Sequence, residues 1–451
     1  MTVAPPPEPA WRALLDGEDA AGALDAAGAV GEALADLPPP TPSSGDPARA
    51  SELAVPSVSG GEAGYALFFA YLDAARPDHG FAEKSLLHLE RAIDLLASGE
   101  ALADLYSGFT GVAWTVEHLR ERLDGGEDLN EEIDEALRDH LGSAPWRRQF
   151  DLTSGLAGYG LYALARLPKP AAEELLELVV DRLAETAVER DGTLTWHSSP
   201  EDIGPEARQR YPQGHENLGV AHGVPGVIAV LARTVGSGVA VAKARSLLDG
   251  AVRWTLAQKL APGSDSVFPY AVAPGIEPQA ARAAWCYGDP GVAAALLVAA
   301  HAAGESAWEA EALDLARTAA RRPAETAGVR DACLCHGAAG LGHLYNRFYQ
   351  ATGEALFRDA AVAWFRHALG LRRPGQGCAG FLTWGPEATG EMGWIAEPSF
   401  LTGAAGIALA LLAAATPQEP RWDELLLVSP APIGRRSEGR ISPLPARSDS
   451  C

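Results

Sequence analysis

The sequence is poor in cysteine and in positive charge, and each scarcity excludes a class of protein. Five cysteines among 451 residues are too few and too scattered for a disulfide framework, so reduced thiols, metal ligands or a nucleophile are favoured. Lysine and arginine number 36 against 59 aspartates and glutamates, and the net charge of −23 repels both phosphate backbones and anionic lipid. The sequence therefore predicts no nucleic-acid partner.

Long hydrophobic runs are also missing. The N-terminus lacks the charged and apolar regions of a signal peptide, and the most apolar stretches, 291–303 and 403–415, are too short and alanine-rich to span a membrane. Runs of β-branched residues are sparse, while alanine, leucine and glycine dominate, which favours helices interrupted by glycine. We expect a soluble, cytoplasmic, all-α protein without an integral membrane segment.

The feature that is abundant is an internal repeat. A Gly-x-x-Gly signature occurs seven times, each time opening an apolar run that is suited to a buried helix. Amphipathic, charge-rich stretches such as 81–96, 130–141 and 355–371 lie between the copies and predict outer helices with one solvated face. The first glycines of the seven copies are Gly61, Gly108, Gly155, Gly223, Gly288, Gly337 and Gly403.

Each unit is thus expected to be an outer helix, a glycine turn and a buried inner helix. Seven such pairs fit either an open solenoid or a closed ring, and the apolar last inner helix favours closure, because the terminal repeats of open arrays carry a polar face. Glycine at both turn positions allows positive φ and close approach of backbones. We expect one ring domain over residues 51–428, a partly ordered Pro/Ala-rich segment over 1–50 and a disordered tail over 429–451.

Reactive side chains stand just before the first glycine in three copies. Cys286 precedes copy five, Cys335 and His336 precede copy six, and His222 precedes copy four. In a ring these equivalent positions converge at one end of the axis. Two thiolates and an imidazole suit Zn²⁺, and three protein ligands leave a fourth position for water or substrate. The alternative is that both cysteines are small buried hydrophobes, a common role for cysteine.

The motifs AHGVPG, WCYGDPG and CHGAAG, set within the sevenfold repeat, resemble those of the lanthionine synthetase C-like cyclases over about residues 55–415. The resemblance implies an α/α toroid, a double barrel of seven inner and seven outer helices with zinc at one end. It also implies a Michael-type addition of peptide cysteine thiolates to dehydroalanine or dehydrobutyrine, which forms lanthionine or methyllanthionine rings in lanthipeptide biosynthesis.

The same resemblance assigns roles residue by residue. A protonated His222 would deliver the α-proton, Asp151 would orient it and raise its pKa, and Arg282 would either pair with Asp151 or stabilise the enolate. Taken singly, these three residues are more often a capping histidine, a helix N-cap and a surface charge. The metal ligands implied are Cys286, Cys335 and His336, and the catalytic residues implied are His222, Asp151, Arg282 and Tyr287, which follows the metal-ligand cysteine.

The implied partners are a dehydrated precursor peptide and a separate dehydratase, because no kinase-like or dehydratase-like region is present. The first three copies are evenly spaced at 47 residues, which leaves no room for the β-rich insertion that binds the leader peptide in some relatives.

Two other functions stay open. A zinc-dependent prenyltransferase-like enzyme also uses an α/α ring, although no DDxxD-type run is present. A lanthionine synthetase C-like protein that binds glutathione or adds a thiol without forming a ring would carry the same motifs.

Overall fold

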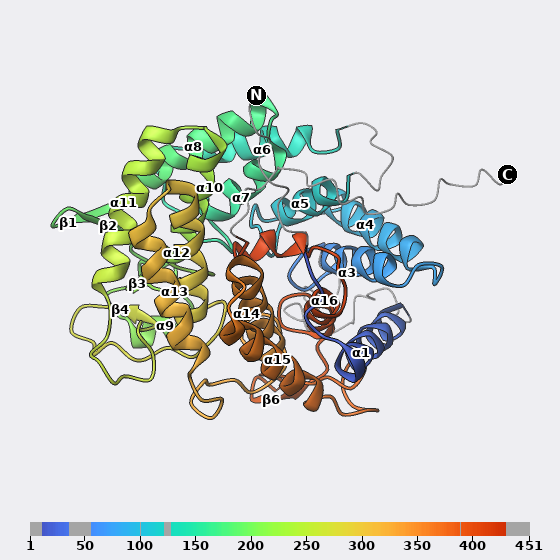
Figure 1. Cartoon of the computed structure of the whole chain (residues 1–451). Coiled ribbons are helices and arrows are strands. Elements are labelled where there is room, and N and C mark those ends of the chain that lie inside the picture. Colours follow the sequence, from blue (N-terminus) through green and yellow to red (C-terminus); the bar gives the residue numbers. More distant parts are fainter. Residues whose placement is uncertain (1–10, 36–55, 100, 121–127, 388, 430–451) are drawn as a thin grey trace, which may run out of the picture.

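The computed structural model describes residues 11–35, 56–99, 101–120, 128–387 and 389–429. Its inner barrel is a closed ring of seven helices, in which each helix contacts the next and the last contacts the first (Figure 1). These inner helices are almost entirely buried, as their apolar sequences predict. They are α3 (Glu62–Ala75), α5 (Phe109–Leu119), α7 (Leu156–Arg166), α10 (Val224–Ser237), α12 (Asp289–Ala303), α14 (Ala338–Thr352) and α16 (Ala404–Ala415).

An outer layer of seven helices covers the ring, so the predicted α/α toroid is confirmed. The outer helices are amphipathic, and each packs its apolar face against one inner helix. In six pairs the outer helix directly follows its inner partner. These six are α4 (Phe81–Ala97), α6 (Glu131–Gly142), α8 (Pro170–Thr186), α11 (Val241–Ala257), α13 (Ser306–Ala320) and α15 (Ala355–Gly370). No described helix is long and apolar enough to cross a membrane.

The seventh outer helix comes from the opposite end of the chain. Helix α1 (Gly17–Ala35) lies within the segment 1–50 that was expected to be only partly ordered, and it packs against α16. Its alanine and glycine face allows close contact, and the Trp11 indole N–H, just before α1, donates to the carbonyl of Ala413 at 2.8 Å. The N-terminal helix thus completes the outer layer around the inner ring. Residues 1–10, 36–55 and the tail after 429 lie outside the described residues.

Close packing explains the glycines of the seven turns. The first glycine has positive φ only at Gly288 (100°), so the expected left-handed turn occurs at one copy alone. The second glycine has no room for a side chain: a Cβ on Gly111 or Gly340 would lie 1.9 Å from the carbonyl oxygen six residues earlier. These glycines therefore let each inner helix begin directly against its own turn.

A belt of main-chain hydrogen bonds joins neighbouring turns around one end of the ring. Six of the seven seams carry such a bond, between 2.9 and 3.4 Å long. Among the described residues, none joins turn four to turn five. The six bonds run from Ser59 to Tyr106, Tyr106 to Thr153, Leu152 to Ala221, Cys286 to Cys335, Cys335 to Leu401 and Leu401 to Ser59.

The centre of the ring is filled by the segment that follows α16. The short 3₁₀ helix η2 (Arg421–Leu426) lies inside the barrel, shown in red near the middle of Figure 1. Asp423 is fully buried and accepts hydrogen bonds from Arg347 and from His343, both on α14. The carbonyl of Leu426 accepts the Trp285 indole N–H at 2.7 Å, directly beside Cys286 in sequence. This central plug supports the turns from within.

Three insertions carry the short strands. The first contains β1 (Val188–Arg190), β2 (Thr193–Thr195), the one-and-a-half-turn helix α9 (Pro205–Arg210) and β3 (Glu216–Asn217). The second contains β4 (Ala271–Val272), which pairs antiparallel with β3. The third is the hairpin of β5 (Thr383–Pro386) and β6 (Met392–Ile395). The first two insertions flank the seam between turns four and five, where the main-chain belt is interrupted.

Candidate functional site

The three predicted metal ligands come together in the structure. The Sγ atoms of Cys286 and Cys335 and a ring nitrogen of His336 all lie within 4.8 Å of one another. Both cysteines are buried, and the main-chain bond from Cys286 to Cys335 across the seam holds the two turns in register. Two soft thiolates and one imidazole form the donor set that zinc prefers, so the residues present fit this ion.

The two thiols of this cluster influence each other's pKa. The hydrogen bond from Cys335 and the nearby His336 lower the pKa of Cys286 well below its usual value. The same hydrogen bond, together with burial, raises the pKa of Cys335. The short distances among the two sulfur atoms and the His336 ring nitrogen would allow all three to reach one cation.

Cys333 belongs to a neighbouring arrangement that serves the loop. Asp331, Cys333 and His336 also bring donor atoms within 4.8 Å of one another. The Asp331 carboxylate, however, already accepts the main-chain N–H groups of Cys333 and Trp384, each at 3.0 Å. Burial and the Asp331 charge raise the pKa of the Cys333 thiol. Cys333 is thus held as a neutral, buried side chain.

His222 and Asp151 form a hydrogen-bonded pair beside this cluster. The Nδ1 atom of His222 lies 2.7 Å from Oδ2 of Asp151, which itself is buried. Burial alone would lower the pKa of His222, but the hydrogen bond to Asp151 and the carboxylate charge outweigh it, and the pKa is raised. The structure thus brings these two predicted residues into contact, and the pair favours an imidazolium.

The local turn structure holds the Asp151 carboxylate in place. Its Oδ1 atom accepts the main-chain N–H of Ser154 at 2.9 Å, which leaves Oδ2 directed at His222. The hydroxyl of Thr153 lies 3.2 Å from Asp151 Oδ2 and 3.1 Å from His222 Nδ1. Thr153 was not among the predicted site residues, although it stands two residues after Asp151 in the same turn.

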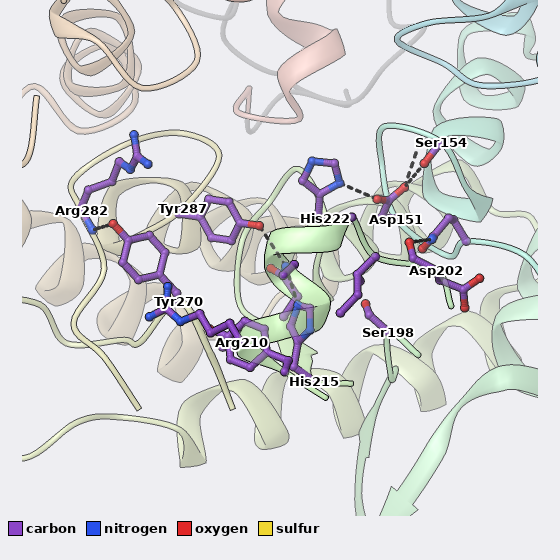
Figure 2. Close-up of a pocket in the computed structure, with 17 residues that line it drawn as sticks. Asp151, Ser154, Ser198, Asp202, Arg210, His215, His222, Tyr270, Arg282 and Tyr287 are labelled. Atoms are coloured by element: carbon purple, nitrogen blue, oxygen red, sulfur yellow. Dashed lines mark hydrogen bonds and ion pairs between the residues drawn. The ribbon is translucent and has the colours of Figure 1, made fainter. Parts of the chain in front are cut away.

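Arg282 and Tyr287 lie on the other side of His222 from Asp151 (Figure 2). Of the two roles predicted for Arg282, pairing with Asp151 does not occur: among the described residues, no carboxylate lies within 4.0 Å of its guanidinium. Its main-chain N–H donates to the Tyr270 hydroxyl at 3.0 Å, which fixes the start of the turn. Its Nε atom is buried and has no hydrogen-bond partner within the described part of the chain.

All four predicted catalytic residues line one cavity with a volume of about 590 Å³. The cavity lies at the interrupted seam and extends between the first two insertions, where Tyr270 forms part of its wall (Figure 2). Tyr211 also lines it. Tyr287 follows Cys286 in the chain, so the cavity adjoins the cysteine and histidine cluster. Asn217, on β3, also lines it and was missed by sequence reasoning.

The fold and the site together define an α/α toroid with a candidate metal centre and an adjoining hydrogen-bonded histidine–aspartate pair. The family model for "Lanthionine synthetase C-like protein" matches residues 54–427, and the chain belongs to this family. It is similar to the nisin biosynthesis protein NisC of Lactococcus lactis subsp. lactis, with 24% identity over 65% of this chain and 73% of that protein.

Two further similarities concern a vertebrate relative and a solved structure. The chain is 25% identical to the glutathione S-transferase LANCL1 of Danio rerio over 70% of this chain and 76% of that protein. The solved structure of nisin cyclase superposes with a TM-score of 0.68 at 22% identity, covering 83% of this chain and 92% of that one. At this identity the superposition establishes the shared fold.

Proposed function

We propose that this protein is a lanthipeptide cyclase, which adds the cysteine thiolate of a peptide to dehydroalanine or dehydrobutyrine and so forms lanthionine or methyllanthionine rings. The observation that carries the proposal is a two-cysteine, one-histidine cluster whose Cys286 directly precedes Tyr287, a residue that lines the same cavity as the His222–Asp151 pair. Membership of the family and the names of the nisin relatives support it.

Cys286, Cys335 and His336 would hold a zinc ion in this site. When bound, zinc lowers the pKa of a coordinated thiol so that the peptide cysteine is present as its thiolate at neutral pH. The reduced thiols of this site also suit the cytoplasm, where we place the protein.

The protein's own residues then direct the addition. As the thiolate sulfur bonds to the β-carbon, the π electrons of the dehydro residue move onto its carbonyl oxygen. Arg282, whose guanidinium has no carboxylate partner among the described residues, stabilises that developing charge. His222 donates a proton to the α-carbon, and Asp151 stabilises its charged form beforehand. The peptide loses its thiol proton and regains one at carbon, so the product has the mass of the substrate.

The substrate requires a prior step by another catalyst. Dehydroalanine and dehydrobutyrine arise when serine and threonine lose water, and we propose that a separate dehydratase supplies the dehydrated precursor peptide. We expect the dehydrated peptide to enter the cavity that His222, Arg282 and Tyr287 line.

A dehydrated peptide that contains one cysteine tests the activity. Incubation with the zinc-loaded protein should abolish labelling by a thiol-alkylating reagent while leaving the peptide mass unchanged. Continued labelling after prolonged incubation would contradict the cyclase function. A mass gain of one glutathione, when glutathione is added and no ring forms, would instead establish an intermolecular thiol addition, the chemistry named for the LANCL1 relative.

Metal analysis tests the ligands separately. The wild-type protein should hold about one zinc per chain, as a three-ligand site implies. Cys286→Ala and Cys335→Ala should each lose it. Cys378→Ala is the matched control, because Cys378 is another free thiol that lies outside the cluster. Full zinc content in both cluster variants would refute the site.

A further inference from the structure

The seam between turns four and five is closed by a side chain. Every other pair of neighbouring turns is joined by a main-chain bond. Here the Nδ2 atom of Asn217, a buried residue held on β3 by pairing with β4, donates to the hydroxyl oxygen of Tyr287 at 3.0 Å. Asn217 thus connects the turn that precedes His222 to the turn that carries Cys286.

Two neighbours fix which way round the Asn217 amide lies. The main-chain N–H of Gly219 can only donate, and it lies 2.8 Å from Oδ1, so Oδ1 is the oxygen. Nδ2 therefore faces Tyr287 and also Nε2 of His215, at 3.3 Å. Burial and the nearby His197 and His222 lower the pKa of His215 to about 4, so its ring is neutral and can accept this bond. Both amide hydrogens are thereby used.

Two glycines make room for the amide. A Cβ on Gly223 would lie 2.7 Å from Oδ1 of Asn217, and a Cβ on Gly219 would lie 2.3 Å from the carbonyl oxygen of Cys286. The backbone of turn four consequently packs directly against turn five. The position of the amide relative to Tyr287 is therefore set by main-chain contacts on both sides.

The direction of this bond has a consequence for Tyr287. Because its oxygen accepts a hydrogen from Asn217, its own hydrogen must point elsewhere. The Tyr287 side chain lines the cavity together with His222 and Arg282 and lies between them in Figure 2. A hydroxyl that already accepts a hydrogen bond is also a better donor.

We propose that Asn217 is a positioning residue that holds the Tyr287 hydroxyl as a hydrogen-bond donor to the carbonyl oxygen of the dehydro residue. This role rests on the proposed cyclase function. Negative charge collects on that oxygen as the sulfur–carbon bond forms, and the Tyr287 proton stays on its own oxygen throughout. Tyr287 and Arg282 together then stabilise the enolate.

Asn217→Asp tests the direction of the bond without changing the shape of the side chain. One carboxylate oxygen still accepts from Gly219, but the other replaces the amide nitrogen and must accept the Tyr287 hydrogen, which turns it away from the cavity. The rate of ring formation should fall about 100-fold, the loss typical of one oxyanion donor. Asn217→Ala, which leaves Tyr287 free to rotate, should lose less.

A purely structural role predicts the opposite order, because aspartate preserves the packing and alanine leaves a gap. Tyr287→Phe should match Asn217→Asp, and the double variant should be no slower than either, because both remove the same donor. If the new negative charge of Asn217→Asp acted in some other way, adding it to Tyr287→Phe would lower the rate of ring formation further. Thermal melting and zinc content confirm that each variant is folded and loaded.

A second readout needs no turnover. The side-chain NH₂ resonances of Asn217, assigned by their loss in Asn217→Asp, should shift in Tyr287→Phe, since that change removes their acceptor. Any of three results would overturn the inference while the wild-type protein still forms rings. The Asn217 resonances could stay unshifted in Tyr287→Phe, the rate losses could be additive in the double variant, or Asn217→Asp could be faster than Asn217→Ala. A wild-type protein that forms no rings would overturn the proposed function and this role with it.

Discussion

Replacing Asp151 with asparagine should lower the pKa of His222 and so disfavour its imidazolium form, which we propose as the proton donor. The main-chain N–H of Ser154 donates to Oδ1 of Asp151, so the asparagine oxygen will occupy that position. The amide nitrogen then takes the place of Oδ2, 2.7 Å from Nδ1 of His222. Because an amide nitrogen only donates, Nδ1 is favoured as an acceptor, and the imidazolium, which carries a hydrogen on Nδ1, is disfavoured.

The magnitude follows from the loss of a charge-assisted hydrogen bond. Such bonds contribute about 1.5–3 kcal/mol, and the His222 side chain is 49% exposed, so solvent screening favours the lower end. About 1.4 kcal/mol corresponds to a fall of about one unit in the pKa of His222. The wild-type pKa is raised, so the acid form persists to higher pH and is lost as pH rises through that value. In Asp151→Asn the acid form of His222 should be lost at a pH about one unit lower.

The assay is the rate of ring formation as a function of pH. The alkaline limb should move to lower pH in Asp151→Asn, so the loss is larger at pH 8 than at pH 6. Asp104→Asn is the matched control, because Asp104 occupies the same position in turn two and accepts a hydrogen bond from Ser107, with no histidine bonded to it among the residues that the structure describes. Its rate should change less than about twofold, as expected of a substitution away from the reacting groups. An equal loss at every pH would refute the acid role of His222.

Two further predictions concern the scaffold. Gly340→Ala places a Cβ 1.9 Å from a main-chain carbonyl oxygen in the turn of the proposed metal ligands, so it should lower the melting temperature and the zinc content. Gly370→Ala is the control, because a Cβ there meets nothing within 4 Å, and it should change neither. Asp423→Asn removes the buried carboxylate that bonds to Arg347 and leaves the more distant Glu419, 3.9 Å away, as its ion-pair partner. It should cost about 3 kcal/mol of unfolding free energy in denaturant titrations, against about 0.5 kcal/mol for the exposed Asp359→Asn. Equal losses in the two members of either pair would contradict these packing arguments.

The sequence predicts the inner ring well because each inner helix is marked twice. A Gly-x-x-Gly turn gives its start, and an apolar run gives its burial. Cys286, Cys335 and His336 could be grouped because equivalent positions in a cyclic repeat meet at one end. The structure brings their donor atoms together and places the predicted catalytic side chains on one adjoining cavity.

The parts that escaped prediction depend on contacts between distant segments. Helix α1 completes the outer layer by packing against α16, but nothing in its alanine-rich sequence indicates that partner. The residues 421–426 have the composition of an ordinary loop, yet Asp423 is buried in the barrel against α14. Asn217 acts through the direction of a hydrogen bond, which is set by Gly219 and His215 and leaves no pattern in the sequence.

The most direct test of the central claim is the absorption spectrum of the cobalt-substituted protein during titration with a cysteine-containing peptide. Two cysteines and one histidine leave one coordination position for the substrate sulfur. One equivalent of peptide should therefore intensify the thiolate-to-cobalt charge-transfer band, and the same peptide with serine in place of cysteine should not. A spectrum that the cysteine peptide leaves unchanged, or that is the same in Cys286→Ala and Cys335→Ala, would contradict the account.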